Sequence, residues 1–554
     1  MKRLARITPL AAAVAFSSFS VASWAETAML EEVLVTAQKR EQRVDDVPLA
    51  VSVIEDDRTI ADMSDVVARV PGFTAAQSFR GPPVYTLRGV GFNSQNLSAT
   101  SPVGIYYDEV AYPYPAMSEG PLFDMERVEV LKGPQGTLFG RSTTGGLVNH
   151  VSRKPTDSPE GYVTLRGGSY ESYGVEGAIN VPLGDTLSAR LAARGDWSDK
   201  GWQYSVTRGD RLGKVDRQGA RLSLLWEPGS DASILLTANW WRDRSETQAP
   251  QPFRFYPQGL ISAGIAPADW YAQGSAIGLP PEFFDQGFEP HKAGETDFPV
   301  RQLAWGGTTA TPAPLDFRKD NELAAISLRG DFSLADGVSL TWLSSYADYD
   351  RNDVREGAGF TIENAILQGL GNIESQSHEW RLTGEGADFS WIAGIAYARD
   401  EVEDLDRSWV GTNSTLQLVR AYASQFGATP AEQAEIFYGA RDAESRSWQL
   451  TDSYAVFGQA DLAIAPDVSL TLGGRYSRDH IRFSGCSGDI GDGNLAVTLN
   501  AYYSSLGIAS TLGPGDCVTF LGDIAGPLFS GGTIPFPPQG RFRDRLTEAS
   551  LSGR

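Results

Sequence analysis

Hydrophobic and polar positions alternate along the chain from residue 160 onward, in stretches of about ten residues. Residues 186–197 show the pattern clearly, and residues 469–477 repeat it. One face of the first stretch holds Leu187, Ala189, Leu191, Ala193 and Trp197, and the other holds Ser188, Arg190, Arg194 and Asp196. A period of two residues predicts β-strands. Strands of this length with one apolar and one polar face are typical of a transmembrane β-barrel, although a soluble β-sandwich gives a similar pattern in any single segment.

The connections between the predicted strands are short and long in alternation. Short turns are expected at residues 183–185, 228–231, 335–337, 384–387 and 465–467, and long loops at 244–319, 405–446 and 484–541. Compact soluble domains seldom carry such loops, whereas barrels join their strands by tight turns at one end and long loops at the other. Trp226 and the Trp240-Trp241 pair lie near strand ends, as interfacial aromatic residues do, with core packing as the alternative for any one of them.

Residues 46–157 lack this alternation and predict a separate α+β unit. Pro48 to Ile54 reads as a strand, and Val103 to Tyr107 as another that turns at Asp108-Glu109. A helix is expected between them, capped by Asp56 or Asp57 and ended by Pro71-Gly72. Its evidence is the helical spacing of Ile60, Met63, Val67 and Val70.

The segment from Asp124 to Pro155 carries the densest motif, DMERVEVLKGPQGTLFGRSTTGGLVNHVSRKP. Its glycines supply positive φ angles and Pro134 presets a turn, so the segment folds back on itself. Together with TLRGVG at residues 86–91, it resembles the plug domain of TonB-dependent outer-membrane receptors. The resemblance implies import of scarce nutrients through a β-barrel of about 22 strands that is stoppered by the plug.

The expected fold is therefore mainly β, with an α+β plug domain followed by an incomplete antiparallel transmembrane β-barrel. We count about twelve strands in residues 158–554, and residues 547–554 read as a strand in mid-course. An open sheet edge is not stable in a bilayer, so we expect the chain to be the N-terminal part of a longer protein.

The resemblance also implies roles for particular plug residues. The glycine framework comprises Gly89, Gly91, Gly133, Gly136, Gly140, Gly145 and Gly146. In the family, plug cations face carboxylates on the inner barrel wall, and the corresponding residues are Arg88, Arg127, Lys132 and Arg141. Simple surface charge is the alternative for Arg127 and Arg141. The sequence departs from the family pattern in three places, with Glu109 for a usual Gly, Lys132 for a frequent Arg and His150 for an apolar residue.

The first 45 residues predict export and a contact with an energising partner. Lys2, Arg3 and Arg6 precede an apolar run and a Ser23-Trp24-Ala25 cleavage signal, so residues 1–25 read as a signal peptide rather than a membrane anchor. Residues 26–45 form a periplasmic segment. Its apolar patch resembles a TonB box, which pairs as an added strand with TonB, and comprises Glu31, Glu32, Val33, Leu34, Val35, Thr36 and Ala37. A flexible tail is the alternative for so short a patch.

Composition excludes several other classes of function. The net charge is −22, and −25 after loss of the predicted signal peptide, which disfavours nucleic-acid binding. The four histidines are scattered, so we predict no metal site and no cofactor. The spacing around Gly140-Arg141-Ser142 fits neither a phosphate-binding loop nor a hydrolase elbow, and no nucleophile and base can be paired. We therefore predict no enzyme activity.

Cys486 and Cys517 are the two cysteines, and both fall in one predicted outer loop. An exported chain passes through an oxidising compartment, so a disulfide between them is expected, with two free thiols as the alternative.

The predicted function is TonB-dependent transport across the outer membrane of a Gram-negative bacterium. The expected partners are TonB with its ExbB-ExbD motor, the outer-membrane lipid and a chelated or bulky small molecule. By family analogy the cargo is a ferric siderophore, with cobalamin, a glycan or a small aromatic compound as alternatives. A secreted soluble β-rich binding module and a passive porin are the competing classes.

Overall fold

The computed structural model describes 12 stretches of chain and a few isolated residues. The stretches are residues 34–55, 59–78, 81–94, 96–206, 209–251, 316–357, 366–386, 388–409, 442–465, 468–489, 511–518 and 542–553, with 292, 295–296, 359, 493, 495–497 and 500 between them. The predicted signal peptide and the box residues Glu31, Glu32 and Val33 lie outside this part of the chain, as do most of the long predicted loops.

The plug is built on a five-stranded sheet with the order β3-β9-β10-β7-β8. These strands are β3 (Ala50–Glu55), β7 (Val103–Tyr107), β8 (Val110–Tyr112), β9 (Met125–Lys132) and β10 (Gly146–Ser152). A second sheet has the order β4-β5-β6, with β4 (Phe73–Gln77), β5 (Pro83–Leu87) and β6 (Val90–Gly91). The helix α1 (Met63–Arg69) packs Met63 and Val66 into a buried cluster with Val130 and Val148 of the sheet.

The predicted start of the helix was wrong. Asp62 is the N-cap, because its side chain accepts a hydrogen bond from the backbone of Ser64, and Asp65 completes a capping box. The acidic residues Asp56 and Asp57 lie outside the described residues. The helical spacing of Met63 and Val67 is confirmed, because both lie in α1.

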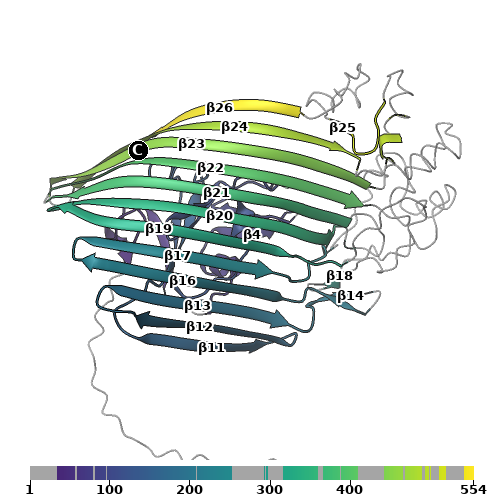
Figure 1. Cartoon of the computed structure of the whole chain (residues 1–554), viewed down its shortest axis with the longest axis horizontal. Coiled ribbons are helices and arrows are strands. Elements are labelled where there is room, and N and C mark those ends of the chain that lie inside the picture. The colour runs from purple at the N-terminus through teal and green to yellow at the C-terminus, as the bar shows by residue number, and fades with distance from the viewer. Residues whose placement is uncertain are drawn as a thin grey trace, which may run out of the picture.

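A 13-stranded antiparallel sheet follows the plug, and its strands follow one another in chain order (Figure 1). Twelve of them have nine residues or more, which matches the predicted number. They are β11 (Glu160–Gly168), β12 (Ser172–Pro182), β13 (Leu187–Ser198), β16 (Asp216–Gly229), β17 (Ala232–Asp243), β19 (Asn321–Ala335), β20 (Val338–Glu356), β21 (Ile366–Glu385), β22 (Phe389–Trp409), β23 (Asp442–Ala465), β24 (Val468–Gly488) and β26 (Phe542–Gly553), and the short strand is β25 (Cys517–Val518). In the described residues, β11 pairs with β12 alone at one edge of this sheet, and β25 and β26 both pair with β24 at the other edge.

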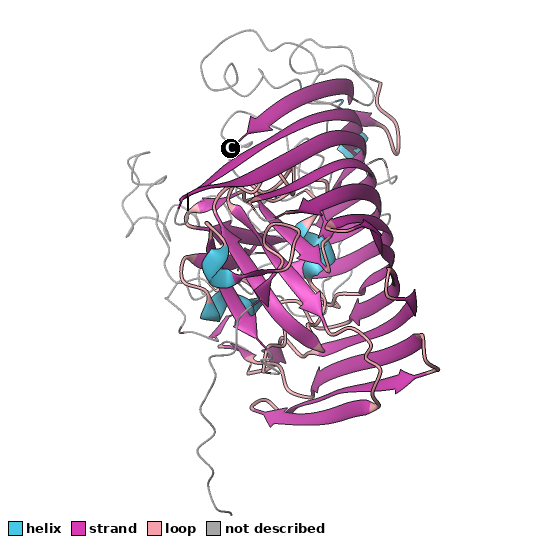
Figure 2. Ribbon diagram, turned by 90° about the vertical axis from the view of Figure 1, so that its left-hand side faces the viewer, coloured by secondary structure: helices cyan, strands magenta, loops and turns pink. Residues whose placement is uncertain are grey.

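The sheet curves around the plug, which lies on its concave side (Figure 2). The predicted alternation holds in β13, where Leu191 is half exposed on the outer face while Arg190 and Arg194 are buried against the plug. Of the tryptophans, Trp226 is exposed on the outer face, whereas Trp241 is buried in a cluster with plug residues. Core packing was thus the better interpretation for one member of the Trp240-Trp241 pair.

The remaining elements are small. Near the ends of the wall strands, a three-stranded sheet has the order β15-β14-β18. Its strands are β14 (Gln203–Ser205), β15 (Arg211–Leu212) and β18 (Glu295–Thr296), and the N-terminal pair is β1 (Leu34–Val35) with β2 (Gln42–Arg43). Two 3-10 turns complete the set, η1 (Val44–Asp46) and η2 (Pro115–Ser118). Within the described residues, no helix is long and apolar enough to cross a membrane.

The predicted 244–319 connection agrees with the end of β17 and the start of β19, whereas the other two long connections are shorter than the alternation pattern predicted. The strands β22 and β23 continue to Trp409 and from Asp442, inside the predicted 405–446 loop, and β24 continues to Gly488. Charged residues such as Asp404 and Asp406 interrupt the apolar pattern there, which is why the sequence predicted a loop. Both residues lie in β22, and their side chains are buried. The short turns at 183–185, 335–337 and 384–387 fall between consecutive strands, as predicted.

Candidate functional site

The N-terminal segment 34–43 is folded against the plug. The strand β1 pairs with β2, and the side chains of Val35 and Ala37 are buried. The backbone N–H of Thr36 donates to Oε1 of Glu129 at 2.8 Å, and its hydroxyl donates to the same carboxylate. The part of the predicted TonB box that the structure describes is therefore held by the plug sheet rather than free.

Two cations just after the box reach the barrel wall. Lys39 Nζ lies 2.6 Å from Oε2 of Glu379 on β21, between the rings of Phe139 and Phe457 at 5.2 and 5.3 Å. Arg40 pairs with Asp461 on β23. Burial lowers the pKa of Lys39 more than the Glu379 carboxylate raises it. Sequence reasoning missed both cations, although the Lys-Arg pair beside the box was a visible signal.

The turn between β7 and β8 carries a buried carboxylate. Asp108 and Glu109 have φ angles of 49° and 68°, the paired left-handed conformation of a type I′ hairpin turn. Glu109 accepts from Arg329 on β19 at 2.6 Å and from Arg381 on β21. Burial alone would raise the pKa of Glu109, but Arg381 and Arg329 outweigh it and hold this pKa well below its usual range. The departure from the family's glycine is therefore a charged anchor, a role that sequence reasoning did not assign.

Asp124 is the anchor on the β13–β16 side of the wall. Its carboxylate accepts two hydrogen bonds from Arg190, at 2.8 and 2.6 Å, and lies 3.5 Å from Arg221. The side chain of Arg194 donates to the backbone carbonyls of Ile60 and Leu122, both at 3.1 Å. At this face, and at Glu109, the plug supplies the carboxylate and the wall supplies the cation, which is the reverse of the predicted arrangement.

The four predicted plug cations have different surroundings. Arg141 pairs with Asp400 on β22, so it does face a wall carboxylate. Arg127 pairs inside the plug with Glu126 and Glu129 instead. Arg88, with a φ of 51°, is exposed, and neither it nor Lys132 makes an ion pair with a described residue.

The glycine framework is explained by crowding at particular positions. Gly146 has a φ of 137°, and a Cβ there would lie 2.2 Å from the carbonyl oxygen of Leu131. A Cβ on Gly140 would collide with the guanidinium group of Arg475 on β24. The other framework residues also lie in turns or strand ends of the plug, at Gly89, Gly91, Gly133, Gly136 and Gly145.

His150 behaves as an apolar residue. It is fully buried, its ring lies 4.5 Å from that of Tyr107, and neither ring nitrogen has a hydrogen-bond partner among the described residues. Burial lowers its pKa to about 3. A neutral imidazole thus occupies the position where the family has an apolar side chain.

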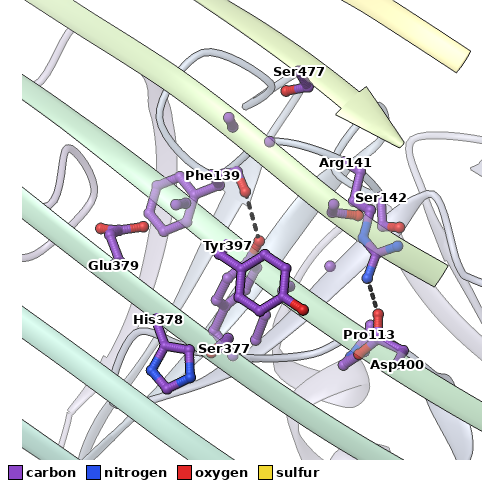
Figure 3. Close-up of a pocket in the computed structure, with 18 of the residues that line it drawn as sticks. Pro113, Phe139, Arg141, Ser142, Ser377, His378, Glu379, Tyr397, Asp400 and Ser477 are labelled. Carbon is purple, nitrogen blue, oxygen red and sulfur yellow. Dashed lines mark hydrogen bonds and ion pairs between the residues drawn. The ribbon is translucent and has the colours of Figure 1, made fainter. Parts of the chain in front are cut away.

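A cavity of about 230 Å³ separates the plug from strands β21 to β24. Figure 3 shows Arg141 bonded to Asp400 on one side of it, while Phe139 and Glu379 lie on the other side. The wall contributes several small side chains, namely Ser375, Ser377, Ala396, Ala398, Ser453, Ala455 and Ser477, together with larger and charged ones such as Tyr397, Asp400 and Arg475. Lys39 and Glu109 line the same cavity, so the N-terminal segment and the β7–β8 turn meet there.

The described residues hold no group of three or more side chains suited to a metal ion. The backbone of Cys517 pairs with Gly488, two residues beyond Cys486, but its side chain lies outside the described part of the structure. The Cys486–Cys517 bridge stays a prediction.

Comparisons with known proteins agree with this architecture. Residues 43–147 match the TonB-dependent Receptor Plug Domain, and residues 271–509 match the TonB dependent receptor-like β-barrel. The ferrioxamine receptor of Yersinia enterocolitica is 26% identical over 190 residues, which are 34% of this chain and 26% of that receptor. The ferripyoverdine receptor of Pseudomonas aeruginosa is 30% identical over 165 residues, 28% of this chain and 19% of that receptor.

Solved structures share the fold at low sequence identity. The ferric yersiniabactin uptake receptor FyuA from Yersinia pestis superposes with a TM-score of 0.58 at 15% identity, over 91% of this chain and 62% of FyuA. The open form of the ferric-catecholate import receptor Fiu from E. coli K12 gives 0.53 at 14% identity, over 92% of this chain and 67% of Fiu. The chain spans about a quarter of the ferrioxamine receptor and less than two thirds of FyuA.

The family matches cover both the plug and the barrel wall, in the order in which the structure has them. A secreted soluble binding module does not have this combination. The chain belongs to the TonB-dependent receptors of the Gram-negative outer membrane, a family of transporters and not of enzymes, and it comprises a plug followed by β-barrel strands.

Proposed function

We propose that the full-length protein imports a ligand across the outer membrane with energy supplied through TonB. In this proposal TonB, driven by ExbB-ExbD, pairs with residues 31–37 as an added strand and pulls on the plug. The outer membrane has no nucleotide supply, so the work must arrive mechanically. Strand addition suits this contact because it relies on main-chain hydrogen bonds and demands little of the side chains.

The observation that carries the proposal is the position of the N-terminal segment. Thr36 is bonded to the plug sheet through Glu129, and Lys39 is bonded to the wall through Glu379. A force on this segment therefore acts at the plug and at the boundary between plug and wall. Charge-assisted hydrogen bonds suit a boundary that separates, since water replaces each partner as the groups part.

A proline substitution in the box tests the dependence on TonB. Val35→Pro removes a backbone donor, so uptake should fall to background while ligand binding to the outer surface persists. Val35→Ala is the matched control, because it keeps the donor and should keep most of the uptake. Normal uptake by the proline variant would exclude strand pairing at this site.

For the cargo, we propose a ferric siderophore. The support is that several similar proteins are named for such ligands, among them the ferrioxamine and ferripyoverdine receptors. With no metal-binding cluster among the described residues, iron would enter within its chelator, which is recognised by shape. Competition binding on the full-length receptor tests this. Tight binding of cobalamin, a glycan or a small aromatic compound, with no ferric chelate bound, would replace the iron assignment and leave the transporter in place.

A further inference from the structure

A continuous series of charged side chains connects the N-terminal segment with the β7–β8 turn. Lys39 Nζ lies 2.6 Å from Glu379, and Glu379 accepts a hydrogen bond from Arg381 at 3.3 Å. The same nitrogen of Arg381 donates to Glu109, which also pairs with Arg329 at 2.6 Å. The N-terminal segment and the β7–β8 turn, whose residues Lys39 and Glu109 are 70 positions apart in the chain, are therefore joined through the wall strand β21.

Most of this series is withdrawn from water. The cations Lys39, Arg329 and Arg381 face the carboxylates of Glu109 and Glu379. Asp331 pairs with Nε of Arg329 at 2.7 Å, and the charge of Arg475 also acts on Glu379. Side-chain exposure is 4% for Lys39, 4% for Glu109 and 2% for Arg381. Charges in such an environment act on one another more strongly than they do at a surface.

We propose that Lys39 and Glu109 stabilise each other through Glu379 and Arg381, so that release of the N-terminal segment and withdrawal of the β7–β8 turn from the wall are coupled. Without Glu109, Arg381 turns fully to Glu379, and Lys39 is left beside an uncompensated cation. Without Lys39, Glu379 competes with Glu109 for Arg381. Loss of the Glu109 contact therefore weakens the Lys39 contact, and loss of the Lys39 contact weakens the Glu109 contact. By linkage, the change in free energy is the same size in both directions.

The strand β7 extends this coupling toward the other end of the wall. It runs from the turn at Glu109 to the loop that holds Leu97, whose backbone N–H donates to Asp404 of β22 at 2.7 Å. Asp404 lies near the end of β22 that leads into a long connection, whereas Arg381 lies near a short turn. The coupling between the two contacts does not depend on the proposed function. Only the assignment of the pull on the N-terminal segment to TonB rests on it.

Thiol labelling of the N-terminal segment tests the coupling without ligand or TonB. Ala37 is 1% exposed, so Ala37→Cys in the full-length receptor in isolated outer membranes should react slowly with a polyethylene-glycol maleimide. Adding Glu109→Gln should raise the labelling rate about tenfold, although Glu109 makes no hydrogen bond to the segment. Adding Glu109→Asp, which keeps the charge and suits the left-handed turn, should raise it much less.

Two further variants separate the coupling from general loosening of the plug. Glu119 is another plug carboxylate that pairs with a wall cation, Lys319 at 3.1 Å, and Glu119→Gln should leave labelling unchanged. Lys39→Met should itself raise labelling, and Glu109→Gln should add nothing in that background. The inference is overturned if Glu109→Gln matches the parent, if Glu119→Gln has the same effect, or if the Lys39 and Glu109 effects add. Because the readout needs no transport, its failure would leave the proposed function untouched.

Discussion

Replacing Asp124 by Asn should weaken the attachment of the plug by about 3 kcal/mol, because it leaves buried arginines without their carboxylate. Asp124 is 3% exposed and accepts a bidentate contact from Arg190, with Arg221 at 3.5 Å. Asn tolerates the residue's φ of 50°, so the substitution removes the charge and spares the turn. The value of about 3 kcal/mol is the low end of the free-energy cost of breaking a buried ion pair. We use the low end because Arg190 retains its ion pair with Glu160, and Arg221 retains its hydrogen bonds to two backbone carbonyls.

The matched control is Asp320→Asn. Asp320 also accepts a bidentate contact from an arginine, Arg242, at 2.7 and 2.9 Å, but its side chain is 43% exposed. Exposed pairs contribute at most about 1 kcal/mol. The two variants are compared by chemical unfolding of the detergent-solubilised full-length receptor. The readout is the protease accessibility of the plug at each denaturant concentration. If Asp124→Asn costs no more than Asp320→Asn, burial does not set the strength of this contact and the reasoning fails.

Two further predictions concern His150 and the cysteines. Because burial holds the folded pKa of His150 at about 3, below an unfolded value of about 6.5, its contribution is fully present above pH 6.5 and is lost as the pH falls toward 3. His150→Phe should therefore remove part of the acid sensitivity of plug unfolding between those values, and an unchanged pH profile would contradict a neutral buried imidazole. Peptide mapping without reductant should recover Cys486 linked to Cys517, and recovery of either as a free thiol would exclude the bridge.

Much of the fold was predictable because it depends on local patterns. Alternation in segments such as residues 186–197 assigns the inner and outer faces, and the crowding at Gly146 explains why the plug motif is so distinct. The contacts of Glu109 could not be predicted in the same way. Its partners Arg329 and Arg381 are 220 and 272 residues away. Which wall strand faces a given plug turn depends on the curvature and stagger of the sheet, and neither leaves a signal in one sequence.

The same limit explains why the sign of the interface charges was predicted only in part. A sequence motif identifies plug cations, but a plug carboxylate such as Asp124 looks like an ordinary turn residue until Arg190 is seen beside it. The structure shows both signs in use, with Arg141 contacting Asp400 on one side and Asp124 contacting Arg190 on the other. Wall arginines on β13 and β16 reach the plug directly, whereas a cavity lies between the plug and β21 to β24. The N-terminal segment contacts the wall through Lys39, at the edge of that cavity, so under a force on the segment the separation of plug and wall should begin there and reach the Asp124 contacts last.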